Sequence, residues 1–144
     1  MAYVSIPTYS RSIPQRYALI AARCKSCGAI NLPLGANCLK CGKILEYESQ
    51  KLSGRGKIYC FTTISRGGSP PEFSAQQNLV GSYPVAVVEL DEGPRIVAQM
   101  TDCRAEDLKI GLEVESTFRR IYDDDGMIRY GVKFRPVRTS REDS

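Results

Sequence analysis

Histidine is absent from the sequence, and its absence removes several kinds of enzyme from consideration. Histidine is the commonest general base, it activates serine and cysteine nucleophiles, and it is a frequent ligand of catalytic zinc. A hydrolytic zinc enzyme is therefore not expected. The composition favours a non-catalytic role.

Two targeting features are also missing. No apolar run approaches the length of a membrane span, and residues 1–12 lack the basic-then-apolar layout of a signal peptide. We therefore expect a cytoplasmic protein with no membrane partner. In such a reducing compartment, Cys-x-x-Cys pairs hold metal ions more often than they form disulfides.

Two such pairs are present, Cys-Lys-Ser-Cys-Gly and Cys-Leu-Lys-Cys-Gly, separated by ten residues. Four thiolates complete a closed tetrahedral metal site, and the glycine after each pair suits a tight knuckle turn. Iron in rubredoxins also uses two such pairs, but those lie much further apart in sequence, and two disulfides are the weaker alternative. The sequence thus predicts one structural zinc ion held by Cys24, Cys27, Cys38 and Cys41.

Positive charge is concentrated in the N-terminal part of the chain. Residues 1–57 hold nine Lys and Arg against two Glu, a net charge of +7, whereas residues 58–144 hold eleven against fourteen acidic residues, a net charge of −3. Four thiolates on one zinc ion would lower the first value to about +5. A basic half of this kind can meet nucleic acid, an acidic protein or a phosphorylated ligand.

The N-terminal part predicts a helix followed by short strands around the cysteines. Residues 1–11 have the mixed composition of an arm. A helix is expected to begin at Ser12, with Ser12 as N-cap, Pro14 in the first turn and Gln15 as capping-box partner. Short strands are expected at 18–23, 29–34 and 44–49.

From residue 57 onward the pattern is that of an all-β domain. A glycine- and proline-rich loop is expected at 66–82, and one or two helical turns at 102–110, between the third and fourth strands. This order of elements is that of an OB-fold, a small five-stranded Greek-key barrel, with an SH3-like barrel as the alternative. The five strands are expected at 57–65, 83–90, 95–101, 112–122 and 127–134.

The predicted fold class is mainly β, with a short N-terminal helix, a rubredoxin-like zinc ribbon and a five-stranded OB-fold barrel. A polar, glycine-rich break at 53–56 separates the last two parts. The predicted segments are an N-terminal arm and helix (1–17), the zinc ribbon (18–53), the OB-fold domain (54–137) and a disordered tail (138–144).

Several motifs carry a resemblance beyond the cysteines. The motifs are Gly54-x-Gly56-Lys57-Ile58-Tyr59-x-Phe61-Thr62, Tyr83-Pro84-Val85, Val88-Glu89-Leu90-Asp91-Glu92-Gly93-Pro94-Arg95, Asp107-Leu108-Lys109-Ile110-Gly111 and Phe134-Arg135-Pro136. In this order and spacing they resemble a family in which a rubredoxin-like zinc ribbon precedes an OB-fold, formerly a domain of unknown function. The proline-rich hairpin of many members is reduced here to Leu32-Pro33-Leu34-Gly35.

The resemblance implies a role in archaeal and bacterial acyl-coenzyme-A metabolism. Members are associated with thiolases and hydroxymethylglutaryl-CoA (HMG-CoA) synthases, where they act as acyl-CoA-binding or scaffolding subunits. It therefore implies a non-catalytic scaffold in lipid or isoprenoid precursor metabolism, with acyl-CoA and one of these enzymes as partners.

A CoA-type ligand needs cations for its phosphates and a groove for its acyl chain. Glycine amides and arginine side chains both bind phosphate closely. The same features would serve single-stranded nucleic acid, with Tyr59, Phe61, Tyr83 and Phe118 stacking on bases. The resemblance favours acyl-CoA over nucleic acid. The candidate ligand-binding residues are Arg66, Gly67, Gly68, Arg95, Arg119 and Arg120, with Arg135 as a further cation.

Two other features are expected to be structural. Cys60 lies in an alternating strand and is expected to be a buried, small apolar residue, and Cys103 is the other cysteine outside the pairs. Asp123-Asp124-Asp125-Gly126 lacks the spaced oxygen ligands of a calcium loop, so it is expected to be a solvated hairpin turn.

Overall fold

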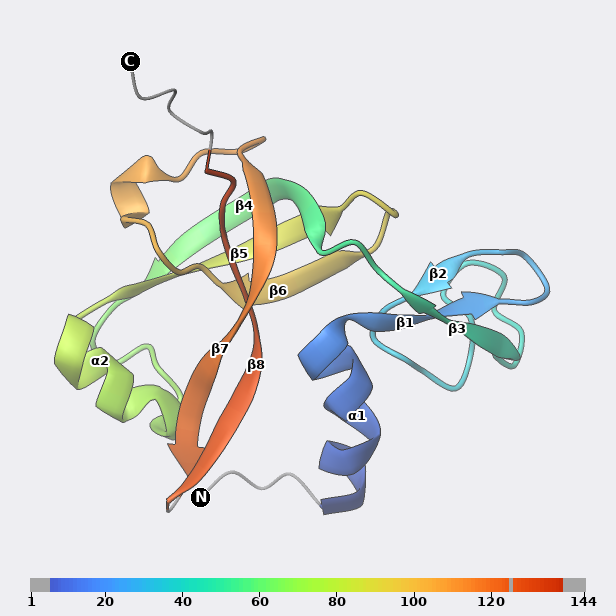
Figure 1. Ribbon diagram of the computed structural model, residues 1–144, viewed down its shortest axis with the longest axis horizontal. Coiled ribbons are helices and arrows are strands. Elements are labelled where there is room, and N and C mark those ends of the chain that lie inside the picture. Colours follow the sequence, from blue (N-terminus) through green and yellow to red (C-terminus); the bar gives the residue numbers. More distant parts are fainter. Residues whose placement is uncertain (1–5, 125, 139–144) are drawn as a thin grey trace.

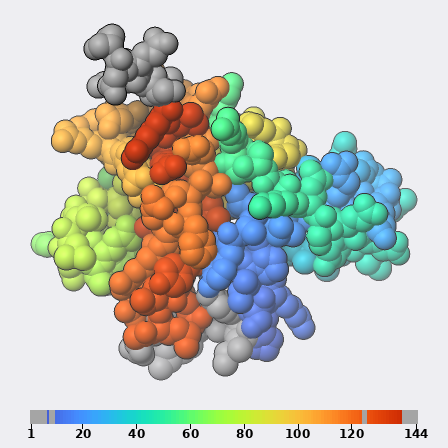
Figure 2. Space-filling view, viewed as in Figure 1, coloured from blue at the N-terminus to red at the C-terminus, as the bar shows by residue number. Residues whose placement is uncertain are grey.

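The computed structural model describes residues 6–124 and 126–138 (Figure 1). A central β-barrel carries the cysteine-containing ribbon at one end and a short helix, α2, at the opposite end. In the space-filling view the ribbon forms a lobe of its own, and helix α1 packs between this lobe and the β7–β8 hairpin (Figure 2). Among the described residues, no helix is long and apolar enough to cross a membrane.

Helix α1 spans Ile6–Ala18, so the prediction of an arm followed by a helix from Ser12 was wrong about its start. The proline of the first turn is Pro7, and Pro14 lies inside the helix, where its missing N–H removes one backbone hydrogen bond. Tyr17 near the end of α1 packs edge-on against Phe118 of the barrel, with ring centroids 5.3 Å apart. Tertiary packing therefore holds this short helix in place.

The ribbon is a three-stranded antiparallel sheet in the order β2–β1–β3. Its strands are β1 (Ile20–Cys24), β2 (Ile30–Asn31) and β3 (Tyr47–Lys51). The exit strand therefore begins later than predicted. Ile44 is the reason, because it pairs with Asn37 in an isolated bridge and so belongs to the second knuckle.

The ribbon and the barrel share one apolar core. Leu19, Leu32 and Leu52 from the ribbon end belong to the same buried cluster as Ile58 and Phe134 of the barrel. The backbone N–H of Leu52 donates to the carbonyl of Leu19, at 3.1 Å. The ribbon is therefore packed onto the barrel as well as joined to it by the chain.

Gly54 marks the junction between the two parts. Its φ is +76°, and a Cβ at this position would overlap the side chain of Ser116 on β7. Its carbonyl accepts a hydrogen bond from the N–H of Ser116, at 2.7 Å. Only glycine combines this backbone conformation with so close an approach.

The C-terminal part is a five-stranded sheet in the order β6–β5–β4–β7–β8, which curls until its edges meet. A parallel bridge between Met100 and Phe134 joins those edges, and the N–H of Thr101 donates to the carbonyl of Phe134, at 2.8 Å. This nearly closed barrel is the predicted OB-fold. Its strands are β4 (Arg55–Ile64), β5 (Tyr83–Leu90), β6 (Arg95–Gln99), β7 (Glu113–Asp124) and β8 (Met127–Pro136).

The expected loop between β4 and β5 contains two helical elements, the 3₁₀ turn η1 (Pro71–Phe73) and α2 (Ser74–Val80). The Phe73 ring packs against Tyr122, with centroids 5.6 Å apart. The buried side-chain amide of Gln77 donates to the carbonyl of Ser65. These long-range contacts stabilise a segment whose composition predicts only a loop.

The helical part of the connection between β6 and β7 is shorter than expected. Only Ala105–Asp107 forms a helical turn, the 3₁₀ turn η2, within the predicted 102–110 segment. Asp107 closes it, because its carboxylate accepts a hydrogen bond from the N–H of Arg104, at 3.1 Å.

Cys60 is exposed, so its predicted burial was wrong. The β4–β5 register shifts between Ile58 and Cys60, and such a bulge reverses the inward–outward alternation beyond it. At the β7–β8 turn, the N–H of Gly126 donates to the Asp123 carboxylate, at 2.7 Å. Of the predicted tail, only Arg138 lies within the described residues.

Candidate metal centre and ligand groove

The four predicted cysteine ligands converge at one point of the ribbon. All four sulfur atoms lie within 4.8 Å of one another. Across the two pairs, the Cys24 and Cys41 sulfurs are 3.9 Å apart and the Cys27 and Cys38 sulfurs are 3.6 Å apart. A tetrahedral ion with metal–sulfur bonds of about 2.3 Å places its sulfurs about 3.8 Å apart. The cluster can therefore hold a metal ion with little rearrangement.

Two matching turns bring the sulfurs together. Gly28 donates its N–H to the Cys24 carbonyl at 2.8 Å, and Gly42 donates to the Cys38 carbonyl at 2.9 Å. Both glycines have positive φ, of +73° and +72°. These are the knuckle turns predicted from the glycine after each pair.

The backbone around the cysteines favours thiolates. The N–H groups of Cys41 and Lys40 lower the pKa of Cys38 to about 6, and the Cys27 N–H is the main cause of a lowered pKa at Cys24. The pKa of Cys27 is raised to about 11: the Ala29 N–H lowers it, but burial and the neighbouring thiols outweigh that effect. Since metals bind the thiolate, the lowered pKa values of Cys38 and Cys24 favour metal binding.

Asn31 supports the metal centre and was not among the predicted site residues. Its side chain is buried, with 2% of the residue exposed. The amide nitrogen lies 3.6 Å from the Cys38 sulfur, and the amide oxygen accepts a hydrogen bond from the N–H of Leu39 at 2.9 Å. The sequence held one signal for it: Asn31 is a polar residue between the apolar Ile30 and Leu32, and a buried polar side chain needs hydrogen-bond partners.

The second feature is a groove of about 440 Å³ on the side of the barrel. It lies on the face where OB-folds commonly bind ligands, beside the second and third barrel strands and the loop after the first, and it also includes residues of strands β7 and β8. Helix α1 forms one wall. The lining is mostly apolar and comprises Gln15, Arg16, Leu19, Ile64, Pro70, Phe73, Tyr83, Val85, Ile96, Val97, Ala98, Gln99, Ile121, Tyr130, Gly131 and Val132.

A few polar groups stand among these apolar residues. The Tyr83 hydroxyl is hydrogen-bonded to the Ser69 hydroxyl at 2.8 Å, and the Gln76 amide donates to the Gln99 side-chain oxygen at 3.2 Å. An apolar hollow with a small number of placed polar groups is the usual form of a small-molecule site. The predicted residues Arg66, Gly67 and Gly68 form a turn between groove-lining Ile64 and Pro70.

The other predicted arginines are distributed over separate places, each beside a carboxylate. Arg95 pairs with Glu89 at 3.0 Å and stacks over the Tyr59 ring at 3.8 Å. Arg120 pairs with Asp123 at 3.4 Å. Arg119 and Arg135 share Asp102, at 3.3 and 3.5 Å. The structure therefore does not assemble these cations into one phosphate site.

The four aromatic residues considered for base stacking do not form one platform either. Tyr83 is buried, with 4% exposed, and Tyr59 is covered by Arg95. Phe118 stacks on Tyr130 of the neighbouring strand, with centroids 5.4 Å apart. Phe61 remains exposed on β4.

Comparison with known proteins places the chain in a family. Residues 49–119 match the family model described as ChsH2, C-terminal OB-fold domain. A protein of Methanocaldococcus jannaschii is 44% identical over 88% of this chain and 87% of its own length, and one of Pyrococcus furiosus is 36% identical over 93% and 94%. Both are named DUF35 domain-containing scaffold protein. The chain belongs to the DUF35 family.

Other relatives of this DUF35 chain are named as subunits of CoA enzymes. Benzoylsuccinyl-CoA thiolase subunit BbsA of Thauera aromatica is 32% identical over 80% of this chain and 74% of its own length. A solved structure titled Ltp2-ChsH2(DUF35) aldolase has a TM-score of 0.68 at 24% identity, over 94% of this chain and 98% of that one. That structure shows that the two chains share a fold.

Proposed function

We propose that this DUF35 protein is a non-catalytic scaffold subunit of a thiolase-type or HMG-CoA-synthase-type enzyme, and that it binds acyl-CoA. The main support for this proposal is the similarity to proteins named as scaffolds, which extends along nearly the whole chain, together with the similarity to a protein named as a thiolase subunit. The ribbon would dock on the enzyme while the barrel offers its groove to the acyl-CoA.

The groove supports the ligand part of this proposal. Its volume of about 440 Å³ and its mostly apolar wall suit the hydrocarbon part of an acyl thioester. The exposed Arg66-Gly67-Gly68 turn lies beside it, where the Arg66 guanidinium group and the Gly67 amide suit a phosphate, while the Gly68 N–H donates to the Ser65 carbonyl within the turn. Arg95, Arg119 and Arg120 are already paired with carboxylates, so they are weaker candidates.

The cysteine cluster supports a structural zinc ion. Four thiolates at tetrahedral spacing complete the coordination of zinc and leave no position for water or substrate. When bound, the ion would stabilise the two knuckles. Asn31 would orient Cys38, as groups that contact metal ligands commonly do.

The remaining cysteines support a non-catalytic assignment. Burial, with Asp107 and Asp102 nearby, raises the pKa of Cys103, so its thiol is a poor nucleophile at neutral pH. Cys60 is exposed on β4, and the chain has no histidine to activate it.

Two experiments with the zinc-loaded full chain test this proposal. Calorimetry with acetyl-CoA is expected to show saturable binding that Val97→Trp weakens, because Val97 lines the groove and is 68% exposed. Leu79→Trp, at an 87% exposed site on α2 outside the groove lining, is the matched control. Size-exclusion chromatography with the thiolase of the same organism is expected to show a complex. Failure of both experiments would refute the proposal, and steeply salt-dependent binding of a single-stranded oligonucleotide would favour the nucleic-acid alternative.

A further inference from the structure

The tip of the second knuckle exposes apolar residues that its fold does not use. Leu39 lies between the two cysteines of the second pair and is 80% exposed, and Ile44 is 79% exposed. Both belong to the hairpin closed by the Asn37–Ile44 bridge. Burial of such residues contributes about 25 cal/mol per Å² of apolar surface. On this hairpin, that contribution can come only from a partner.

This tip is held rigidly. The Leu39 N–H donates to the buried Asn31 side chain at 2.9 Å, and the Cys38 N–H donates to the Lys43 carbonyl, also at 2.9 Å. Cys38 and Cys41, which flank Leu39 and Lys40, are brought together by the sulfur cluster. A surface that is ordered before binding loses little conformational entropy when a partner docks.

The two knuckles differ in the residues at their tips. The first has Lys25 and Ser26 between its cysteines, whereas the second has Leu39 and Lys40, and Lys43 precedes the exposed Ile44. At the first knuckle the isoleucine in the position of Ile44 is Ile30, which packs against the core, whereas the second knuckle leaves its isoleucine and Leu39 exposed. The metal site needs neither pair of tip residues.

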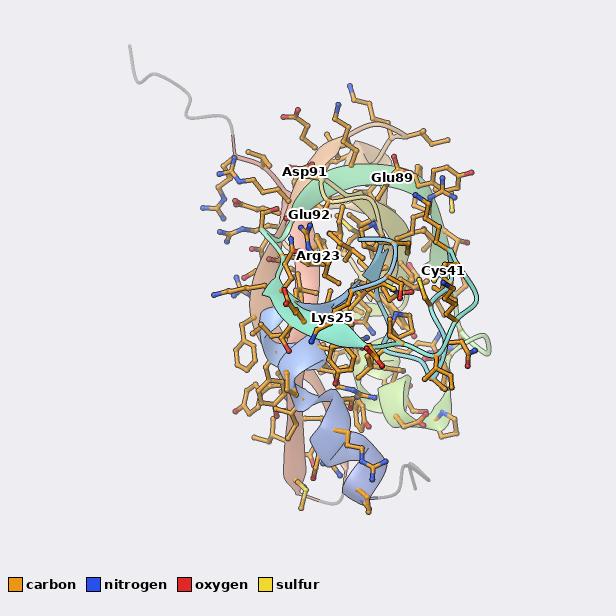
Figure 3. The ribbon with its side chains drawn as sticks, turned by 90° about the vertical axis from the view of Figure 1, so that its right-hand side faces the viewer. Arg23, Lys25, Cys41, Glu89, Asp91 and Glu92 are labelled. Carbon is orange, nitrogen blue, oxygen red and sulfur yellow. The ribbon has the colours of Figure 1, made fainter. Side chains whose placement is uncertain are left out.

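The charge beside the apolar pair is positive. Lys40 and Lys43 are both exposed, and among the residues that the structure describes neither makes an ion pair. With its two glutamates and a bound zinc ion counted, the N-terminal part (1–57) would still carry about +5. The acidic barrel residues Glu89, Asp91 and Glu92 lie higher than Cys41 in the view of Figure 3. An apolar centre with a basic rim is complementary to an apolar centre with an acidic rim.

From this geometry we infer that the second-knuckle tip, formed by Leu39, Lys40, Lys43 and Ile44, is the docking surface for an acidic-rimmed apolar patch on the thiolase-type enzyme. The inference rests on the proposed function and names the surface through which it acts. Nucleic acid is disfavoured as the occupant, because the tip offers aliphatic rather than aromatic side chains for contact with bases.

The test measures binding of the zinc-loaded full chain to the purified thiolase of the same organism. Leu39→Asp and Ile44→Asp each place a charge in the apolar centre, and each is expected to weaken binding by about 30-fold or more. Leu79→Asp is the matched control, since Leu79 is 87% exposed on α2, at the opposite end of the molecule (Figure 1). Zinc content and circular dichroism of all three variants are expected to match those of the unaltered chain.

Charge reversal tests the rim separately. The double variant Lys40→Glu, Lys43→Glu is expected to slow association about 10-fold at low salt and to reduce its salt dependence. Full-strength binding by both Leu39→Asp and Ile44→Asp would overturn the inference while leaving the proposed function intact. A loss with Leu79→Asp instead would also overturn it.

Two other outcomes have distinct meanings. Absence of any complex with the unaltered chain, with acetyl-CoA present or not, would overturn this inference together with the scaffold proposal. The unaltered chain could instead bind a single-stranded oligonucleotide, and the double variant Lys40→Glu, Lys43→Glu could abolish that binding while leaving binding to the thiolase unchanged. This result would assign the knuckle to nucleic acid and overturn the docking inference.

Discussion

The ribbon and the barrel reach a folded state by different means. In the barrel, long strands bury large side chains such as Ile58, Val114 and Phe134 almost completely. In the ribbon, the buried cluster around the metal centre consists of Ala22, Leu45 and the cysteines themselves. A region with so little apolar volume is expected to depend on metal ligation for its stability, whereas the barrel depends on packing. The following predictions separate these two sources of stability.

Loss of one metal ligand is expected to have the largest effect. Cys38→Ser removes a thiolate from a site whose zinc affinity, by analogy with zinc-finger peptides, is worth about 10 to 16 kcal/mol. Residues 24–45 are expected to unfold, while the barrel strands persist. Zinc analysis, limited proteolysis and amide NMR spectra measure this, with Cys60→Ser at an exposed position as the control. Unchanged metal content would show that the four-ligand assignment is wrong.

Truncation of a side chain in the barrel core is expected to destabilise the barrel while leaving the zinc site occupied. Phe134 is fully buried and takes part in the bridge that closes the barrel. Phe134→Ala is expected to lower the free energy of unfolding by about 3 to 5 kcal/mol, as large-to-small core changes do. Urea denaturation measures this loss, and zinc analysis is expected to show a retained ion. Loss of the zinc ion from Phe134→Ala would contradict the separation of the two regions.

A substitution at the junction between ribbon and barrel is expected to have the next largest effect on stability. Gly54→Ala both strains a backbone with φ +76° and forces a Cβ against Ser116. We expect a loss of about 2 to 4 kcal/mol in the free energy of unfolding, from strain and overpacking together. Gly67→Ala is the control, because φ is +87° there and no atom lies within 4 Å of the added Cβ. Its cost is expected to be only about 1 to 2 kcal/mol. Equal losses at both sites would show that the close approach to Ser116 is unimportant.

Removal of the group that supports the metal ligand is expected to act chiefly on zinc affinity. Asn31→Ala eliminates the contact to the Cys38 sulfur and leaves the Leu39 N–H without its acceptor. Metal affinity is expected to fall about 10- to 100-fold. Competition with a chromophoric chelator measures the change, and Asn78→Ala on exposed α2 is the control. Equal affinity in the two variants would refute the role assigned to Asn31.

The smallest effect concerns acid stability of the barrel. Burial raises the pKa of Asp102, but Arg119 and Arg135 outweigh this and hold it below its ordinary value of 3.8. A lowered folded-state pKa stabilises the protein above pH 3.8 and loses that contribution as the pH falls below it. Asp102→Asn is expected to cost about 1 kcal/mol or less at neutral pH and to flatten this acid dependence. Urea titrations from pH 6 to about 2 measure it, with exposed Asp91→Asn as the control.

The barrel strands were the part best predicted from sequence. An apolar, valine-rich run between a predicted loop and a predicted turn gave the bounds of β5, Tyr83–Leu90, without error, and the order of strands led to the OB-fold. The cysteine ligands were equally accessible, because Cys-x-x-Cys-Gly is a local pattern and the metal-binding geometry follows from it. Local patterns of this kind need no knowledge of distant contacts.

The features that were missed depend on contacts between distant segments. Helix α2 is stabilised through Phe73 and Gln77, whose partners Tyr122 and Ser65 cannot be inferred from the sequence. The exposure of Cys60 follows from a bulge that strand propensity does not reveal. The groove forms only where α1 packs against the barrel, a contact between distant segments. The predicted arginines form ion pairs with carboxylates such as Asp102 and Glu89 instead of lining one phosphate site.

The core shared by ribbon and barrel has a consequence for a cell that is short of metal. Leu32 lies between the two knuckles in sequence, yet it is buried in the barrel's cluster beside Leu19 and Leu52. If a zinc ion holds the knuckles as proposed, its loss is expected to release Leu32 from this cluster and to uncover apolar surface on the barrel. Exposed patches of this kind promote aggregation and recognition by chaperones and proteases. The abundance of the scaffold would then follow the zinc supply, with no dedicated sensor.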